Sequence, residues 1–243
     1  MACNSHDTAM RGDREQRPAA TSPSEPGAGR DIDRLLAKIA CLPTGGIPLT
    51  LVSTAGFHCE VWQSIGVLVS GPHRTEIDFV LKRYLRPSSL AATRVLGREH
   101  ETLRQALGDI VPATRFVATR VNGKVGVVAL CETCPPWFDL GNPANEEEAL
   151  PLLARHRRAR DDLVRFVAHA RRWLDEEGKV IDLCGTENLV LDRAYRVRYI
   201  DSFHVFFYLD VLHTLQEVDE ELRYRLDLAV RRLRYLEALS QRA

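Results

Sequence analysis

The chain has 243 residues, and its 33 Lys and Arg residues balance 33 Asp and Glu residues, so the formal net charge is zero. A dedicated nucleic-acid-binding protein needs a basic excess for its phosphate contacts, and this balance excludes that class. The longest wholly apolar run is about five residues, far too short to span a membrane. The N-terminus lacks the apolar segment of a secretory signal. We therefore expect a cytoplasmic protein with one large domain or two small lobes.

The first half of the chain predicts a disordered tail, a short helix, and then strands around one longer helix. Residues 1–30 combine Pro, Gly, Ser and charges without an apolar period, which is typical of disorder, and residues 31–40 form a short helix. The longer helix covers 88–107 and ends at Gly108. Asn122-Gly123 predicts a tight hairpin turn. The expected strands are 49–52, 61–69, 77–81, 114–121 and 124–130.

The second half predicts mainly helices with one small hairpin. Residues 135–144 form a connector rich in Pro, Gly and Asn, and 146–177 form a long helix with a break near Pro151. Segments 188–191 and 196–200 predict a hairpin, and everything after Ser202 is expected to be helical. The order of elements predicts an α+β fold with a β-rich part at 31–134 and an α-rich part at 135–243. A cleft between two such parts is a usual place for a small-molecule site.

Two surface features of the helices allow alternative interpretations. Seven arginines between 155 and 172 indicate either a solvated helix face or a binding face for an acidic partner. The last helix carries a heptad-like seam that either packs into the core or mediates a helix dimer. The seam residues are Leu222, Leu226, Ala229, Leu233 and Leu236.

Lys82 ends an apolar strand in a chain in which only four of the 33 basic residues are lysines. Its alternative role is an edge lysine whose amine reaches water. Glu99 lies on the inner stripe of the 88–107 helix, between Leu96 and Leu103, whereas Glu101 faces outward. A carboxylate on an inner face is costly unless it finds a cationic partner. We therefore predict an ion pair between Glu99 and Lys82.

Three oxygen-bearing side chains surround the predicted small hairpin. Asp182 and Asn188 flank a tight loop, and Asp201 ends the following strand. Carboxylate and amide oxygens suit Mg²⁺, and a carboxylate can also orient an attacking hydroxyl. The alternatives are turn residues for Asp182 and Asn188 and a helix N-cap for Asp201.

In this order of elements and residues, the chain resembles the protein-kinase-like superfamily over roughly residues 48–205. The resemblance implies a two-lobed protein-kinase-like fold with a β-rich N-lobe and a reduced α-helical C-lobe. It further implies that Lys82 holds the ATP phosphates and pairs with Glu99. Asp182 would accept the proton of the substrate hydroxyl, and Asn188 and Asp201 would be the Mg²⁺ ligands.

The resemblance also implies a hinge at 130–134, with Glu132 and Cys134 beside the adenine, and a phosphate-binding loop at 53–58 that contains Gly56. That loop keeps a single glycine, and Asp182 and Asn188 lie six residues apart where the family has five. The chain therefore is more similar to compact, lipopolysaccharide-kinase-like bacterial proteins than to signalling kinases.

The expected function is transfer of the γ-phosphate of ATP, with Mg²⁺, to a hydroxyl of a protein, sugar or lipid acceptor. Two alternatives follow from the departures in the loops. One is a catalytically inactive pseudokinase that acts as a nucleotide- or partner-binding module. The other is a scaffold that binds no nucleotide.

Overall fold

The computed structural model describes residues 47–243 except 55–57, 71, 122–123, 186 and 211–218. The predicted tail at 1–30, the short helix at 31–40 and Gly56 lie outside the described residues. The Asn122-Gly123 turn also lies outside them, although Val121 and Lys124 pair on either side of it.

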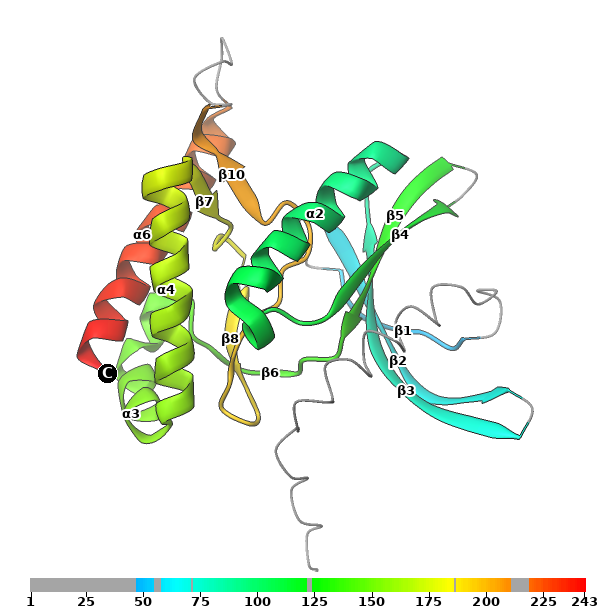
Figure 1. The fold of residues 1–243 in the computed structure, drawn as a ribbon, viewed down its shortest axis with the longest axis horizontal. Coiled ribbons are helices and arrows are strands. Elements are labelled where there is room, and N and C mark those ends of the chain that lie inside the picture. Colours follow the sequence, from blue (N-terminus) through cyan, green and yellow to red (C-terminus); the bar gives the residue numbers. More distant parts are fainter. Residues whose placement is uncertain (1–46, 55–57, 71, 122–123, 186, 211–218) are drawn as a thin grey trace, which may run out of the picture.

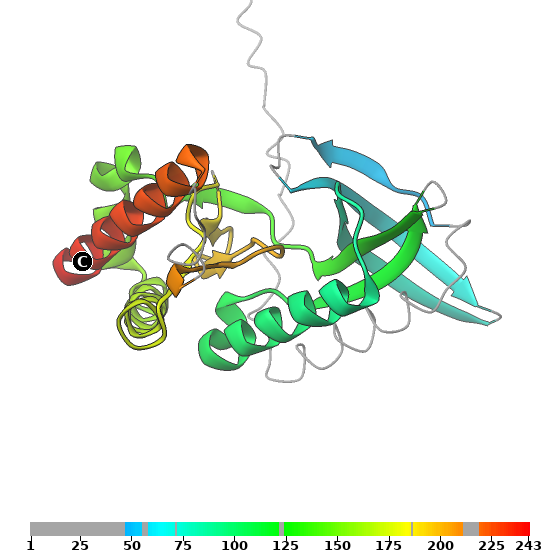
Figure 2. The same ribbon diagram turned by 90° about the horizontal axis from the view of Figure 1, so that it is seen from above.

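An antiparallel sheet of five strands, in the order β1-β2-β3-β5-β4, forms one end of the molecule (Figures 1 and 2). Every strand predicted in the first half of the sequence is confirmed, and the middle strands are longer than expected. Phe79 of β3 and Val127 of β5 are both buried, but they lie on opposite faces of the sheet and in separate apolar clusters, so each face is partly covered. The strands are β1 (Thr50–Ser53), β2 (Cys59–Ser70), β3 (His73–Tyr84), β4 (Thr114–Val121) and β5 (Lys124–Glu132).

Helix α2 (Leu90–Leu107) connects β3 to β4, packs against β4, and confirms the predicted helix. It begins at Ser89, whose hydroxyl accepts a hydrogen bond from the Ala92 amide at 3.1 Å. It ends at Gly108, which adopts φ of 60°, a conformation that glycine reaches without strain. A short 3-10 turn, η2 (Gly108–Ile110), follows.

The rest of the chain contains three more described helices and five short strands. The predicted long helix is broken at His156 rather than near Pro151, which lies within α3. Three strands were not predicted, because segments of three or four residues carry too little periodicity to be recognised. One of them, β10, lies where a helix was expected. The elements are β6 (Pro136–Asp139), η3 (Pro143–Asn145), α3 (Glu146–Arg155), α4 (Arg157–Glu177), β7 (Lys179–Ile181), β8 (Leu189–Asp192), β9 (Val197–Tyr199), β10 (Phe206–Tyr208) and α6 (Glu220–Arg242).

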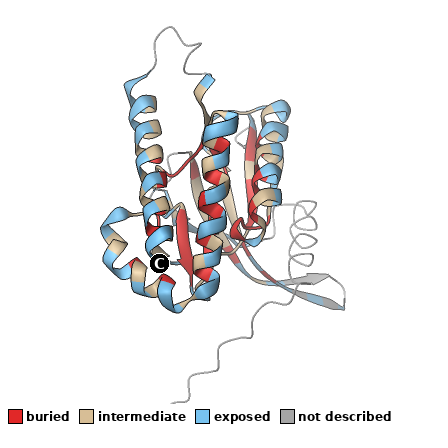
Figure 3. Cartoon of the chain, turned by 60° about the vertical axis from the view of Figure 1, so that its left-hand side comes forward, coloured by how far each residue is buried: buried red, intermediate tan, exposed pale blue. Residues whose placement is uncertain are grey.

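The largest core lies between α4, α6 and the short strands, and the helices turn their buried residues toward it (Figure 3). The predicted apolar stripe of α4, which includes Phe166 and Trp173, is buried there. The α6 seam is buried in the same core through Ala229, Leu233 and Leu236. The seam is therefore filled by the chain itself, which favours core packing over the dimer interpretation.

The arginine-rich face of α4 is exposed and carries ion pairs within the chain. Arg157 pairs with Asp161, and Arg171 pairs with Asp175 at 3.1 Å. This arrangement agrees with the interpretation as a solvated helix face, and such exposed pairs contribute little stability.

Helix α2 belongs to both cores of the molecule. Its residues Leu103 and Leu107 are part of the large core, whereas Leu96 packs with β5 and Phe203 in a smaller cluster. The structure thus confirms a mixed α+β fold with a sheet-rich part and a helix-rich part. The division into domains at residue 134 stays a prediction. In the described part of the chain, no helix is both long and apolar enough to cross a membrane.

Candidate functional site

The strand that carries Lys82 lies in the sheet interior, where Lys82 is opposite Val61 on β2 and Ala129 on β5. Its Nζ donates a hydrogen bond to the backbone carbonyl of Ile200, which is 118 residues further along the chain. Its ammonium also opposes the rise in the pKa of Asp201. The fold therefore brings the predicted lysine beside the predicted metal-binding aspartate.

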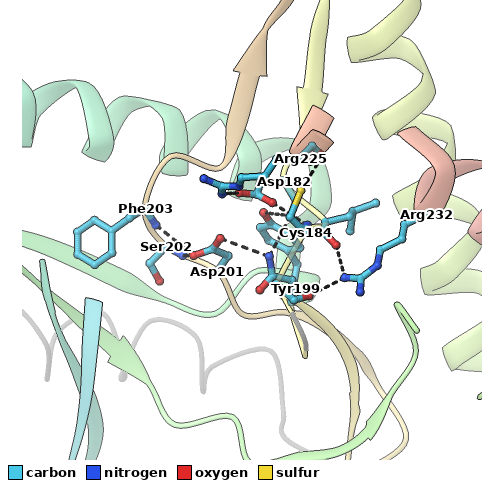
Figure 4. Close-up of polar contacts among 11 residues, drawn as sticks. Asp182, Cys184, Tyr199, Asp201, Ser202, Phe203, Arg225 and Arg232 are labelled. Carbon is cyan, nitrogen blue, oxygen red and sulfur yellow. Dashed lines mark hydrogen bonds and ion pairs between the residues drawn. The ribbon is translucent and has the colours of Figure 1, made fainter. Parts of the chain in front are cut away.

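Asp201 follows β9 in a loop that lies against the sheet. Its Oδ1 accepts a hydrogen bond from the backbone amide of Ser202 at 2.7 Å (Figure 4). Burial is the main cause that raises the pKa of this carboxyl to about 6, with a further rise caused by Asp182. No helix begins at Asp201, so its predicted alternative as an N-cap is wrong.

Asn188 joins the two aspartates. Its Nδ2 donates to the backbone carbonyl of Asp182 at 3.2 Å and lies 3.4 Å from Oδ2 of Asp201. A Cβ atom at Gly185 would lie 2.3 Å from Oδ1 of Asn188, so only glycine leaves room for this side chain. The structure therefore brings Asp182, Asn188 and Asp201 together, as the sequence predicts.

Asp182 is a buried carboxylate that is already paired. It directly follows β7, and its side chain is only 3% exposed. Oδ1 accepts a hydrogen bond from the Cys184 amide at 2.7 Å, which is the local turn that the sequence offered as an alternative. Oδ2 forms an ion pair with Arg225 of α6 at 2.9 Å (Figure 4).

Two arginines of α6 hold the loop between Asp182 and Asn188, and sequence reasoning missed both. Arg225 pairs with Asp182, and the carbonyl of Arg225 accepts from the Cys184 thiol at 2.8 Å. Arg232 donates to the carbonyl of Leu183 at 2.5 Å and to that of Gly185 at 2.8 Å (Figure 4). No local pattern could reveal these contacts, because the partners lie more than 40 residues apart.

The predicted ion pair between Lys82 and Glu99 is not formed, which corrects the sequence-based expectation. Glu99 is half-buried and accepts a hydrogen bond from the hydroxyl of Tyr208 at 2.5 Å. Tyr208 belongs to β10, and because a helix was expected there, this competing partner could not be anticipated. Glu101 is exposed, as predicted.

Glu132 and Cys134, whose backbone was predicted to lie beside the adenine, turn their side chains toward the buried Arg198. Arg198 is 2% exposed and donates to Oε1 of Glu132 and to Sγ of Cys134, each at 2.8 Å. The backbone amide of Glu132 already donates a hydrogen bond to the Ala113 carbonyl at 2.8 Å. Burial raises the pKa of the Cys134 thiol to about 11, so the thiol stays neutral. These side chains therefore serve packing, and any contact with a base would use other backbone groups of the segment.

Phe203 fixes the loop after Asp201 to the sheet-rich part. It is fully buried against Leu96 and β5, and its ring contacts Tyr84 at 5.1 Å and Phe116 at 5.7 Å between centroids. Such aromatic contacts hold the loop in one position. The chain is thus anchored on both sides of Asp201, by Lys82 at Ile200 and by the aromatic contacts of Phe203.

Neither of two surface cavities along α2 is lined by Lys82, Asp182 or Asp201. Among the described residues, no group of three or more His, Cys, Asp and Glu side chains is arranged to hold a metal ion. A scan against protein-family models gives no match, and a search of curated proteins finds no significant similarity.

Proposed function

We propose that this protein has a two-lobed protein-kinase-like fold, binds ATP with Mg²⁺, and transfers the γ-phosphate to a hydroxyl of a protein, sugar or lipid acceptor. The observation that carries the proposal is the contact of Lys82 with the Ile200-Asp201 segment, across 118 residues of sequence. In such an arrangement the lysine can bind the phosphate oxygens of ATP, and the aspartate can bind the metal ion that accompanies them. We also propose a cytoplasmic location.

The strand order and the position of α2 support this fold. The sheet is antiparallel in the order β1-β2-β3-β5-β4, with the lysine on the central strand β3 and the helix inserted directly after it. The other candidate residues come from loops of the helix-rich part, which meet Lys82 where the two parts touch.

The donor set fits Mg²⁺ in its chemistry. Asp201 supplies a carboxylate and Asn188 an amide oxygen, and hard cations prefer such ligands with phosphate oxygens completing the shell. In this structure Asn188 directs its amide nitrogen toward Asp201, so ligation requires the amide to turn. When bound, the metal would neutralise charge on the transferred phosphoryl group. Lys82 would exchange its bond to the Ile200 carbonyl for a phosphate oxygen.

The ion pair between Arg225 and Asp182 favours the second candidate, a pseudokinase that binds nucleotide without turnover. A carboxylate that orients an attacking hydroxyl must be free to accept its hydrogen bond. Here both carboxylate oxygens of Asp182 already have partners within the chain. Because the side chain is also only 3% exposed, an acceptor hydroxyl would reach Asp182 only if Arg225 or the loop moved.

The first test is a thermal-shift titration of the full chain with ATP, with and without Mg²⁺. Ligand that binds only the native state raises the unfolding midpoint. We expect a Mg²⁺-dependent rise in the wild type that is lost in Lys82→Ala and Asp201→Asn. Lys124→Ala is the matched control, because Lys124 is an exposed lysine of the same sheet.

The second test measures ATP consumption by the wild type and by Asp182→Asn, which keeps a hydrogen-bond acceptor at the buried position. A kinase loses turnover in this variant while it still binds nucleotide, because orientation of the nucleophile matters mainly in the transition state. Binding without turnover in the wild type would establish the pseudokinase. If no nucleotide binds, both proposals are wrong and a scaffold remains.

A further inference from the structure

A groove between α2 and β4, two elements that pack together in Figure 1, combines a cavity with unused positive charge, and Glu99 does not line it. The cavity has a volume of about 430 Å³, which is the size of known small-molecule sites. Arg94 and Arg115 line it, one from the helix and one from the strand, and Arg98 borders the adjoining hollow on α2. We call this the α2–β4 groove.

The three guanidinium groups of the groove are exposed, and none forms a hydrogen bond or ion pair within the part of the chain that the structure describes. The carboxylate in the groove, Glu101, accepts a hydrogen bond from Gln105 at 3.0 Å. Three cations against one anion leave a local excess of positive charge, although the whole chain is neutral. The groove therefore favours an anionic ligand.

Gly97 lies in the middle of α2 and faces the groove. A glycine in a helix interior costs about 1 kcal/mol relative to alanine. Packing does not require it here, because a Cβ atom at this position would meet nothing within 4 Å. Gly97 leaves the floor of the groove open, because any side chain at this position would extend into it.

His100 forms part of the groove wall and has an unused polar atom. The residue is only 3% exposed, and its Nε2 has no hydrogen-bond partner within the described chain. Burial lowers the pKa of this imidazole to about 4, so the ring is neutral near pH 7. An unsatisfied buried polar atom is costly, so a ligand group that reached Nε2 would gain a hydrogen bond there.

We propose that the α2–β4 groove binds a soluble phosphomonoester. Arginine forks match phosphate oxygens with two parallel hydrogen bonds, which makes phosphate a better partner here than a single carboxylate. Phe116 and Leu90 in the wall supply apolar surface for the organic part of the ester. This groove is distinct from the proposed nucleotide site, because neither Lys82 nor Asp201 lines it.

The test is calorimetric titration of the full chain with phenyl phosphate at pH 7.5 and about 0.15 M salt. We expect saturable binding that weakens roughly tenfold or more in Arg94→Gln/Arg115→Gln. Gly97→Leu fills the groove without an expected loss of helix stability and should weaken binding to a similar extent. Arg231→Gln/Arg234→Gln removes two exposed arginines of α6 and should leave the affinity unchanged.

Two further titrations distinguish binding of an ester in this groove from binding of phosphate alone and from binding at the proposed nucleotide site. Inorganic phosphate should bind more weakly than phenyl phosphate, and equal affinities would contradict recognition of an ester. Lys82→Ala should bind phenyl phosphate normally, so loss of binding there would move the ligand to the proposed nucleotide site and overturn the inference. Absence of saturable binding in the wild type, or an equal loss in the α6 control, would also overturn it.

Discussion

Gly185 matters because its missing side chain makes room for another residue. The amide of Asn188 occupies the space that a Cβ atom would need, at 2.3 Å from its oxygen. The same loop is held by Arg232 through the Gly185 carbonyl, so the backbone has little freedom to move away. The position of Asn188 between Asp182 and Asp201 therefore depends on a glycine at 185.

We predict that Gly185→Ala destabilises the protein by about 1–3 kcal/mol, because overpacking forces Asn188 or the loop to shift. Urea unfolding monitored by circular dichroism measures the change. Gly66→Ala is the control, because a Cβ atom there meets nothing within 4 Å and neither glycine has a positive φ. Equal stability of the two variants would show that the loop has more room than the structure indicates.

At the scale of elements, α6 acts as the support of the loop that carries Asp182. Arg225 and Arg232, two turns apart on the helix, hold a side chain and two carbonyls of this loop. The guanidinium of Arg225 also lies over the ring of Phe207 at 5.3 Å. The last helix thus holds this loop by polar contacts, whereas Phe203 holds the segment after Asp201 by apolar packing.

We predict that Arg225→Gln lowers the free energy of unfolding by about 3 kcal/mol, because it leaves a buried carboxylate without its cation. Combining it with Asp182→Asn should recover a large part of the loss, since the unpaired charge is then removed. Arg223→Gln, an exposed change on the same helix, should stay within about 0.5 kcal/mol of the wild type. Additive losses in the double variant would show that the ion pair contributes nothing to folding.

At the scale of the whole molecule, α2 connects the sheet-rich part to the helix-rich part. Leu103 and Leu107, near the end of α2, belong to the large core. His100 of the same helix contacts Phe116, which in turn contacts Phe203. A charge on His100 would therefore be poorly solvated, because the ring is 3% exposed and packs against Phe116. Protonation of this ring should therefore oppose folding.

We predict that stability falls as the pH drops from about 6.5 to about 4, partly because of His100. Burial lowers the pKa of its imidazole to about 4, whereas the unfolded chain takes up the proton near 6.5. In this range the unfolded state binds more protons than the native state, so acid favours unfolding, by about 3 kcal/mol at most. His100→Leu should remove this part of the slope when urea unfolding is measured across the range. Parallel curves for wild type and variant would contradict the prediction.

The sequence by itself determined the longer elements and the identity of the residues that meet. Periodicity located the five sheet strands, α2, α4 and α6, because long segments repeat their pattern often enough to be recognised. The residue types and the resemblance to the kinase-like superfamily singled out Lys82, Asp182, Asn188 and Asp201, which lie in segments that the fold brings together.

Tertiary structure alone decided the partners of these residues. Glu99 bonds to Tyr208 because β7 and β10, three residues each, pair across the chain and bring that hydroxyl to α2. Arg225 neutralises Asp182, and Arg198 occupies Glu132 and Cys134, through contacts between segments more than 40 residues apart. The physical reason is that a buried charge takes whichever counter-charge the packing brings near, and packing is a property of the whole chain rather than of any local pattern.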